Sequence, residues 1–156
     1  MSSIWRPDAQ EVLHDKKARA GLPRYFDVMQ DSKLAKFTIA KRLPADFSPQ
    51  DSLEQLWTLH SSITEEYYRL EKQLDSEKNS FNTLTTSEKS YLDLKAEIAR
   101  RIMEKCHLCT RRCGFNRLAG ELGLWCRSGN QITVSTMFEH MGEEPELVPS
   151  GTIFTL

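Results

Sequence analysis

The chain has 156 residues, of which 39% are hydrophobic and 28% charged, and its formal net charge is −1. This composition supports a core and excludes a disordered protein, and the length fits one domain or a small domain with a helical extension. The balanced charge gives no global attraction to nucleic acid or to an anionic membrane. The first residues lack the basic and apolar regions of a signal peptide, and no apolar run approaches the roughly 20 residues that cross a bilayer. We therefore expect a soluble cytoplasmic protein without a membrane partner.

Residues 1–47 are expected to form an irregular or helical amino-terminal extension. Pro7 suits the first turn of a helix, and residues 9–20 have the composition of a short charged helix that ends at Gly21. Residues 34–43 fit a helix and a strand equally well.

Residues 48–105 are predicted to form a helical hairpin. Ser48 and Pro49 suit the cap and the first position of its first helix. Large side chains then follow in alternating steps of three and four, which is a heptad pattern. These residues are Leu53, Leu56, His60, Ile63, Tyr67, Leu70 and Leu74.

The second helix of the hairpin is predicted to begin at a capping box formed by Thr85 and Glu88. The two helices should be of similar length and joined by a short polar turn, which favours antiparallel packing. A coiled-coil dimer is the alternative, because the same heptad pattern serves both. The second helix leads directly into Cys106, so the cysteine segment should be mounted on a rigid arm. Its apolar face carries Leu84, Tyr91, Leu94, Ile98 and Ile102.

All four cysteines lie within residues 106–130, in the order Cys106-x2-Cys109-x3-Cys113-x12-Cys126. In a reducing compartment, clustered cysteines are metal ligands more often than disulfides. A Cys-x2-Cys pair can bring both sulfurs to one metal at about 2.3 Å, and a third cysteine nearby can join them. Four thiolates close the coordination sphere and favour a structural Zn²⁺, and the same set can hold a [4Fe–4S] cluster. Unligated or redox-active thiols are a third reading.

Basic residues surround these cysteines and give residues 105–127 a net charge of +4. Arginines near a thiolate lower its pKa and offset the formal −2 charge of a zinc tetrathiolate centre. A solvated face and a phosphate-binding patch of a nucleic-acid module are the alternatives. Only Phe115 and Trp125 supply aromatic side chains here, which argues against nucleic acid. Trp125 is expected to cover a small core beside Cys126.

Residues 131–156 are predicted to form a short β tail. Residues 131–137 alternate and are β-branched, which indicates a strand, and residues 152–156 give a second strand signal. An acidic loop over 139–149 is expected to join them.

Other potential site residues have weaker patterns. His107 lies between two cysteines and is expected to point away from the metal. His140 can be a ligand, a substrate contact or, by default, a loop histidine. Glu143 and Glu144 are adjacent carboxylates that could serve in acid–base chemistry, but without a visible partner they are expected to be solvated.

Three stretches together resemble one family. The cysteine segment, a His-x-Gly-Glu-Glu-Pro motif and a Gly-Thr-Ile-Phe strand resemble the segment before the catalytic core of radical SAM proteins related to pyruvate formate-lyase activating enzymes. The front of the chain resembles the amino-terminal extension of a longer, archaeal-type subgroup. The matching residues are Cys106, Cys109, Arg111, Cys113, Gly114, Asn116, Arg117, Gly120, Glu121, Gly123, Cys126, His140, Gly142, Glu143, Glu144, Pro145 and 151–154.

The sequence departs from that family in one small and one large respect. Trp125 is inserted beside Cys126. In the family, the Gly-Thr-Ile-Phe strand begins the barrel and leads into Cys-x3-Cys-x2-Cys, which holds the [4Fe–4S] cluster that cleaves S-adenosylmethionine. Here the sequence ends at Leu156 and that motif is absent. The resemblance therefore implies a piece that is truncated or split from its barrel, with S-adenosylmethionine bound only by full-length members.

We accordingly expect a mainly α chain in four segments, 1–47, 48–105, 106–130 and 131–156, which acts as the metal-binding accessory segment of a radical SAM protein. No residue is assigned a catalytic role, and the sequence leaves open whether the protein is an enzyme. The implied partner is a separate radical SAM barrel subunit or a glycyl-radical-type protein. The alternatives are a stand-alone zinc-knuckle interaction module and, less favoured, a nucleic-acid-binding zinc module.

Overall fold

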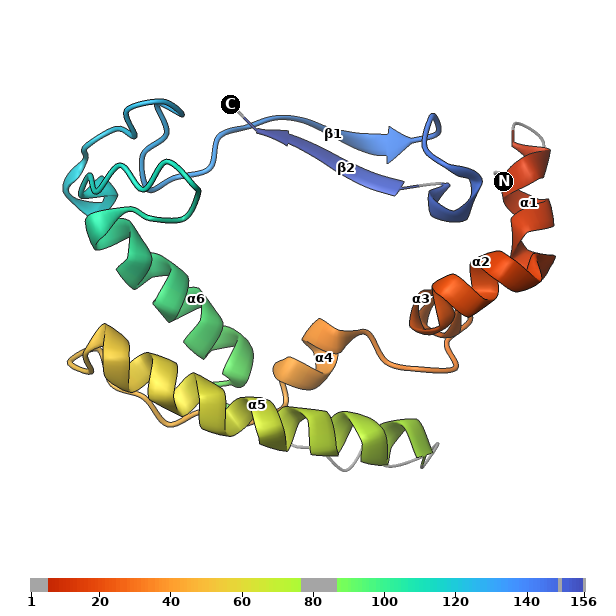
Figure 1. Cartoon of the computed structure of the whole chain (residues 1–156), viewed down its shortest axis with the longest axis horizontal. Helices are drawn as coiled ribbons and strands as arrows, with labels where there is room; N and C mark the ends of the chain where they lie inside the picture. The colour runs from red at the N-terminus through yellow and green to blue at the C-terminus, as the bar shows by residue number, and fades with distance from the viewer. Residues whose placement is uncertain (1–5, 77–86, 149, 156) are drawn as a thin grey trace. The chain divides into compact units, whose positions relative to one another are not determined.

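The structure is a computed structural model that describes residues 6–76, 87–148 and 150–155. Its elements are mainly helices, with one two-stranded antiparallel sheet (Figure 1). The chain divides into two compact units, one of residues 34–130 and one that combines residues up to 33 with those from 131 onward. Among the residues described, no helix is both long enough and apolar enough to cross a membrane.

The unit of residues 34–130 is built around two long helices and one short one. Its core is a single cluster in which Ile39, Leu56 and Leu94 are almost completely buried. The helical elements are α4 (Lys36–Ala40), α5 (Leu53–Ser76), α6 (Tyr91–Ile102), η4 (Met103–Lys105) and η5 (Arg117–Ala119).

Helix α4 resolves the ambiguity of residues 34–43 in favour of a helix. Ile39 and Ala40 are buried in the core, whereas Phe37 on the other side of the helix is 62% exposed. After α4, the chain becomes extended, and Pro44 forms an isolated antiparallel bridge with Ser90. This bridge ties the end of the amino-terminal segment to the start of α6.

Helices α5 and α6 pack against each other and run in opposite directions, as predicted for a hairpin (Figure 1). The end of α6 contacts the turn before α5 through Arg101, while Tyr91 at its start contacts Thr64 in the middle of α5. The heptad pattern is confirmed as the packing face: Leu56, Ile63 and Tyr67 are buried, and Leu53, Leu70 and Leu74 pack against the core. The expectation of similar lengths is wrong, because α5 has 24 residues and α6 has 12.

Helix α5 begins at Leu53, later than the predicted start at Ser48. Ser52 is its cap: the Ser52 hydroxyl accepts from the Gln55 amide at 3.2 Å, and Gln55 Oε1 accepts from the Ser52 amide at 2.7 Å. Residues 48–51 instead form a turn, in which Asp51 donates its amide to the Ser48 carbonyl at 3.1 Å. The reciprocal Ser52 and Gln55 bonds satisfy two amides that have no partner within a helix beginning at Leu53.

Helix α6 begins at Tyr91 and has a capping box of Ser90 and Asp93. The Asp93 amide donates to the Ser90 hydroxyl at 3.3 Å, and the Ser90 amide donates to the Asp93 carboxylate at 2.8 Å. The predicted capping box at Thr85 and Glu88 is therefore not the start of this helix; Thr85 itself, like Leu84, lies outside the described residues. The predicted apolar face is confirmed over Tyr91, Leu94 and Ile98, which are buried.

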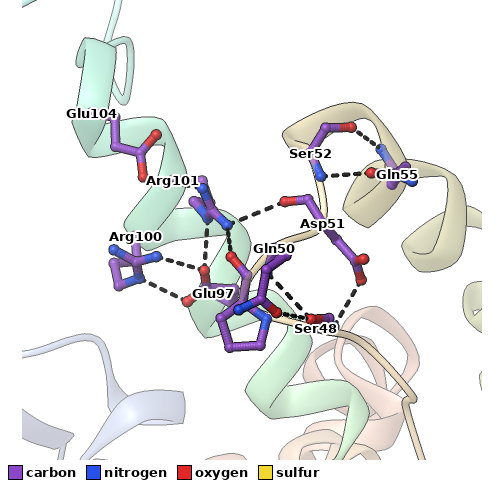
Figure 2. Close-up of polar contacts among 10 residues, drawn as sticks. Ser48, Gln50, Asp51, Ser52, Gln55, Glu97, Arg100, Arg101 and Glu104 are labelled. Carbon is purple, nitrogen blue, oxygen red and sulfur yellow. Dashed lines mark hydrogen bonds and ion pairs between the residues drawn. The ribbon is translucent and has the colours of Figure 1, made fainter.

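Arg101 at the end of α6 fixes the turn before α5 (Figure 2). Its guanidinium donates to the Asp51 carbonyl at 3.1 Å and also to the Pro49 carbonyl, while its Nε donates to Glu97 at 2.8 Å. Glu97 also receives two bonds of 2.7 Å from Arg100, which faces solvent. One carboxylate thus orients the arginine that joins the two helices.

The other unit combines the first helices with the β hairpin. The charged helix predicted over residues 9–20 is divided at Asp15, whose side chain caps a new helix by accepting from the amides of Lys17 and Ala18. Phe26 is the most buried side chain of this part. The helical elements are α1 (Pro7–Glu11), η2 (Val12–His14), α2 (Lys16–Gly21), α3 (Pro23–Met29) and η6 (Pro145–Leu147).

The predicted two-stranded tail is confirmed, with shifted boundaries. Strand β1 covers Val134–His140 and pairs in antiparallel register with β2, Ser150–Thr155, so that Met137 faces Ile153. The acidic loop predicted from residue 139 therefore starts too early, because β1 continues through His140. Met137 and Ile153 are 73% and 58% exposed.

Candidate metal centre

The helical arm delivers the first cysteine as predicted. Helix α6 continues into η4, and Cys106 caps the end of that turn. The Cys106 amide donates to the Phe115 carbonyl at 3.0 Å, and the Gly114 amide donates to the Cys106 carbonyl at 2.9 Å. These two bonds close residues 106–115 into a loop that carries Cys109 and Cys113.

Two residues of this loop have a left-handed backbone. Arg112 has φ 41° and Gly114 has φ 73°. Arg112 donates its amide to the Cys109 carbonyl at 3.1 Å, which makes a tight turn between the second and third cysteines. Gly114 is needed here because a left-handed backbone is strained for a residue with a Cβ.

The segment between the third and fourth cysteines folds back through η5. The Asn116 side chain accepts from the Ala119 amide at 3.1 Å, and Glu121 accepts from the Asn116 amide at 2.5 Å. Gly120 ends the turn with φ 88°. Asn116, Gly120 and Glu121 are motif residues of the resemblance, and here they build the turn rather than line the cysteine cavity.

Cys126 lies in a second tight loop. The Arg127 amide donates to the Gly123 carbonyl at 2.9 Å, and the Gly123 amide donates to the Ser128 carbonyl at 3.1 Å. A Cβ added at Gly123 would overlap the Cys126 sulfur, well inside van der Waals contact. Glycine at this position therefore gives the thiol its space.

All four cysteines line one cavity of about 470 Å³. Cys106 is buried, Cys113 is intermediate, and Cys109 and Cys126 are exposed. The structure thus brings together the four residues that the sequence singled out, although Cys126 is distant along the chain. The other lining residues are Leu108, Arg111, Arg117, Trp125 and Ser128.

The two terminal cysteines have similar surroundings. Burial raises the pKa of Cys106, but the Leu108 amide, Arg117 and Cys113 together hold it below its usual value. The pKa of Cys126 is also lowered, first by the Ser128 amide and then by the Ser128 hydroxyl. In both cases, the amide two residues further along the chain stabilises the thiolate, which is the form that binds metals.

Arg117 connects the two ends of the cysteine segment. Its Nε donates to the Gly129 carbonyl at 2.9 Å, and its Nη1 lies 3.6 Å from the Cys106 sulfur. The sequence indicated a favourable charge for this residue and placed it in the motif of the resemblance. Its role as a link depends on the fold-back at η5, which has no clear signal in the spacing of the cysteines.

Trp125 was expected to cover a small core beside Cys126, and this prediction is wrong. It is 65% exposed, and the Arg111 guanidinium lies 4.4 Å from its ring centroid. Cation–π stacking of this kind lets both side chains stay at the edge of the cavity. Arg111 therefore adds positive charge to the mouth of the cysteine cavity.

The sulfurs are not arranged as a coordination sphere. Across residues 6–76, 87–148 and 150–155, no three side chains of His, Cys, Asp or Glu are grouped closely enough to hold a metal ion. The four cysteines are all free thiols. Rotation about a single side-chain bond moves the sulfur of each cysteine, so the sulfur positions within the shared cavity are adjustable.

The other sequence candidates lie elsewhere. His107 donates from Nδ1 to the Lys105 carbonyl at 2.9 Å, is exposed and does not line the cavity. His140 Nδ1 lies 2.9 Å from Glu143 Oε1, at ion-pair distance but without hydrogen-bond geometry. Glu144 precedes η6 and is its N-cap residue. His140 is thus at the end of β1, rather than in the loop where it was predicted.

The chain is similar to a curated protein of Methanocaldococcus jannaschii, the uncharacterized protein MJ0674. The two are 40% identical over 133 residues, which make up 85% of this chain. The chain spans 36% of the length of that relative. No family model matches the chain, and no solved structure matches it.

Proposed function

We propose that this chain binds one metal centre through Cys106, Cys109, Cys113 and Cys126, and that it is the accessory segment of a radical SAM protein. The observation that carries the metal proposal is the single cavity lined by all four cysteines. Zn²⁺ is the favoured occupant and a [4Fe–4S] cluster is the alternative, because four thiolates suit both.

The surroundings of the thiols support this proposal. Four thiolates around Zn²⁺ carry about two net negative charges. Arg117, beside Cys106, and Arg111, at the mouth of the cavity, offset these charges. The backbone amides of Leu108 and Ser128 help to hold down the pKa values of Cys106 and Cys126. Hydrogen bonds of this kind orient ligands and tune a metal site.

The radical SAM part of the proposal rests on the sequence motifs. It assigns catalysis to a barrel on a separate chain or on a longer form of the protein, so we expect this chain not to cleave S-adenosylmethionine alone. The relative from M. jannaschii extends well beyond the aligned residues, since the chain spans 36% of it. The proposal also includes the barrel or a glycyl-radical-type protein as partner, and the reducing cytoplasm as location.

The two occupants would supply different chemistry. Zinc would hold the loop of Cys106 against the loop of Cys126, and so present α6 and the cysteine segment as one rigid arm. An iron–sulfur cluster would add electron transfer. In both cases, the work of the chain itself is to orient four thiolates through Arg117, Gly123 and the two amides.

The metal proposal is tested by the metal-to-protein ratio of chain purified without oxygen. Zinc or iron is measured in the wild type, in each single Cys→Ser variant and in His107→Ala as the matched control. We expect one centre per wild-type chain, retention in His107→Ala and loss in the cysteine variants. Equal metal content in Cys109→Ser and the wild type would overturn the ligand assignment.

The choice between an accessory segment and a stand-alone module needs a second experiment. Full-length MJ0674 purified without oxygen is tested for reductive cleavage of S-adenosylmethionine, and the present chain serves as the comparison. The proposal expects 5′-deoxyadenosine from the long protein and none from the chain. If the long protein contains iron and sulfide but does not cleave S-adenosylmethionine, the result favours the alternative, in which the present chain is a zinc-knuckle interaction module.

A further inference from the structure

A second cavity, of about 340 Å³, lies where α4, α5 and α6 meet. Its lining shares no residue with the cysteine cavity. The volume is in the range of pockets that hold small molecules, roughly 300–1,000 Å³. The lining residues that matter here are Lys36, Phe37, His60, Tyr68, Tyr91 and Lys95.

His60 anchors a chain of hydrogen bonds in this cavity. Lys95 Nζ lies 3.0 Å from His60 Nε2, and an ammonium can only donate, so Nε2 accepts and the imidazole is neutral. The Thr64 hydroxyl donates to the His60 carbonyl at 2.6 Å. The Tyr91 hydroxyl lies 2.7 Å from that of Thr64 and 3.1 Å from His60 Nε2. Lys95 and the Tyr91 hydroxyl therefore both lie at the one lone pair of His60 Nε2.

Lys95 carries a positive charge that no carboxylate in the described part of the chain neutralises at ion-pair distance. Its contacts are the neutral His60 and the face of Tyr91, whose ring centroid is 4.3 Å from Nζ. The pKa of His60 is lowered by burial and by Lys95, so the two groups do not both carry a charge. A cation held between two neutral groups is a natural position for an incoming anion.

The remaining walls are aromatic. Phe37 and Tyr68 are 62% and 50% exposed, although both line the cavity. Lys36 Nζ lies 5.7 Å from the centroid of Tyr68 and 3.8 Å from Glu71, so its charge is already shared. The cavity thus has one unneutralised cation and flat apolar surfaces on the same side of the helices.

We propose that this cavity binds a small organic anion whose flat apolar body lies on Phe37 and Tyr68 and whose carboxylate or phosphate accepts from Lys95. Cavities of this kind fix a ligand by a few convergent polar groups within an apolar lining. The inference is independent of the cysteine site and of any metal bound there. It assigns a ligand-binding role to the helical hairpin, which otherwise serves as a support.

Calorimetric titration of the whole chain with 2-naphthoate and 2-naphthyl phosphate tests this proposal. We expect both probes to bind, and the neutral 2-naphthamide to bind at least about tenfold more weakly, the scale of losing a charge-assisted hydrogen bond. Lys95→Met should weaken the binding of both anions by a similar factor and leave the affinity for 2-naphthamide unchanged. Lys95 is exposed, so its replacement should not unfold the chain.

Lys72→Met is the matched control, because Lys72 is an exposed lysine of α5 that does not line the cavity. Amide NMR shifts of the wild type on addition of 2-naphthoate should be confined to residues around α4 and the facing turns of α5 and α6. The proposal is overturned if neither anion binds at millimolar concentration, if Lys72→Met weakens binding as much as Lys95→Met, or if the shifts lie on other elements.

Discussion

Gly123 is the residue on which the position of the fourth thiol depends. Its missing side chain leaves room for the Cys126 sulfur, and its amide and carbonyl also close the loop that carries this cysteine. We predict that Gly123→Ala weakens metal binding about 10–100-fold, the usual effect of disturbing the groups around a ligand. The measurement is competition for zinc with a coloured chelator.

Gly129→Ala is the matched control for that experiment. A Cβ at Gly129 would lie 3.6 Å from Leu122, an ordinary van der Waals contact. This variant should bind zinc like the wild type. Equal affinity of both alanine variants and the wild type would show that Cys126 does not depend on the space left by Gly123, and would contradict the role assigned to this glycine.

Glu97 links the stability of the fold to pH. The Arg100 and Arg101 guanidinium groups hold the pKa of Glu97 below its ordinary 4.5. A lowered pKa in the folded state stabilises the fold above pH 4.5, and this contribution is lost as the pH falls through the folded value. We predict that Glu97→Gln lowers the free energy of unfolding in urea at neutral pH and has a smaller effect in acid. Glu65→Gln, at an exposed site of α5, should leave the free energy of unfolding unchanged at both pH values.

Ser90 caps α6 and is 1% exposed. Replacement of a capping serine by alanine costs about 1 kcal/mol, because one amide of the first turn loses its acceptor. We expect Ser90→Ala to lower the free energy of unfolding by about this amount in a urea titration. Ser61→Ala, where the hydroxyl only returns to a carbonyl of its own helix, should change it by less. A larger loss at Ser61 would contradict the assignment of the cap.

At the scale of elements, Arg101 and Arg100 form a natural pair for comparison (Figure 2). Both donate to Glu97, but only Arg101 also donates to the carbonyls of Pro49 and Asp51. Hydrogen bonds to a charged group contribute about 1.5–3 kcal/mol, whereas an exposed ion pair contributes about 0–1 kcal/mol.

We therefore predict that Arg101→Met destabilises the chain by at least about 1 kcal/mol more than Arg100→Met, in urea titrations followed by circular dichroism. The loss should come from the turn before α5, since the helix itself keeps its core side chains. If Arg100→Met is the more damaging change, then the contact between α6 and residues 49–51 does not hold the hairpin together.

The helices were predictable where apolar spacing decides, and less so at their ends. Ile63 and Tyr67 are buried at positions that the heptad pattern gives, because the same face must meet α6. The start at Ser48 was wrong, since Pro49 suits a turn as well as a helix. A Ser-x-x-Gln pattern at Ser52 was present in the sequence and marks the true start.

The candidate site was predictable in its cysteines and not in its supports. Spacing alone grouped Cys106 with Cys109 and Cys113, since residues that close in sequence share a loop. Gly120 and Gly123 allow the chain to fold back to Cys126, but the bond of Arg117 to the loop after Cys126 is specified by no local pattern. Trp125 was misjudged because its partner, Arg111, is far away along the chain.

At the scale of the whole molecule, the chain divides into two compact units. Residues 34–47 join the hairpin and the cysteine segment in one unit, because Ile39 and Leu43 fill the core beside α5. The sequence did not indicate a boundary near residue 34, because no change in composition marks it within residues 1–47. The central claim for the molecule is that this unit ends in a metal centre made of four thiolates.

X-ray absorption at the metal edge of anaerobically purified chain tests that claim most directly. The account predicts about four sulfurs at about 2.3 Å around a single zinc, without a second metal nearby. A sulfur shell with iron neighbours would keep the four ligands and replace zinc by the cluster. A shell dominated by oxygen or nitrogen, or a chain without bound metal, would contradict the account.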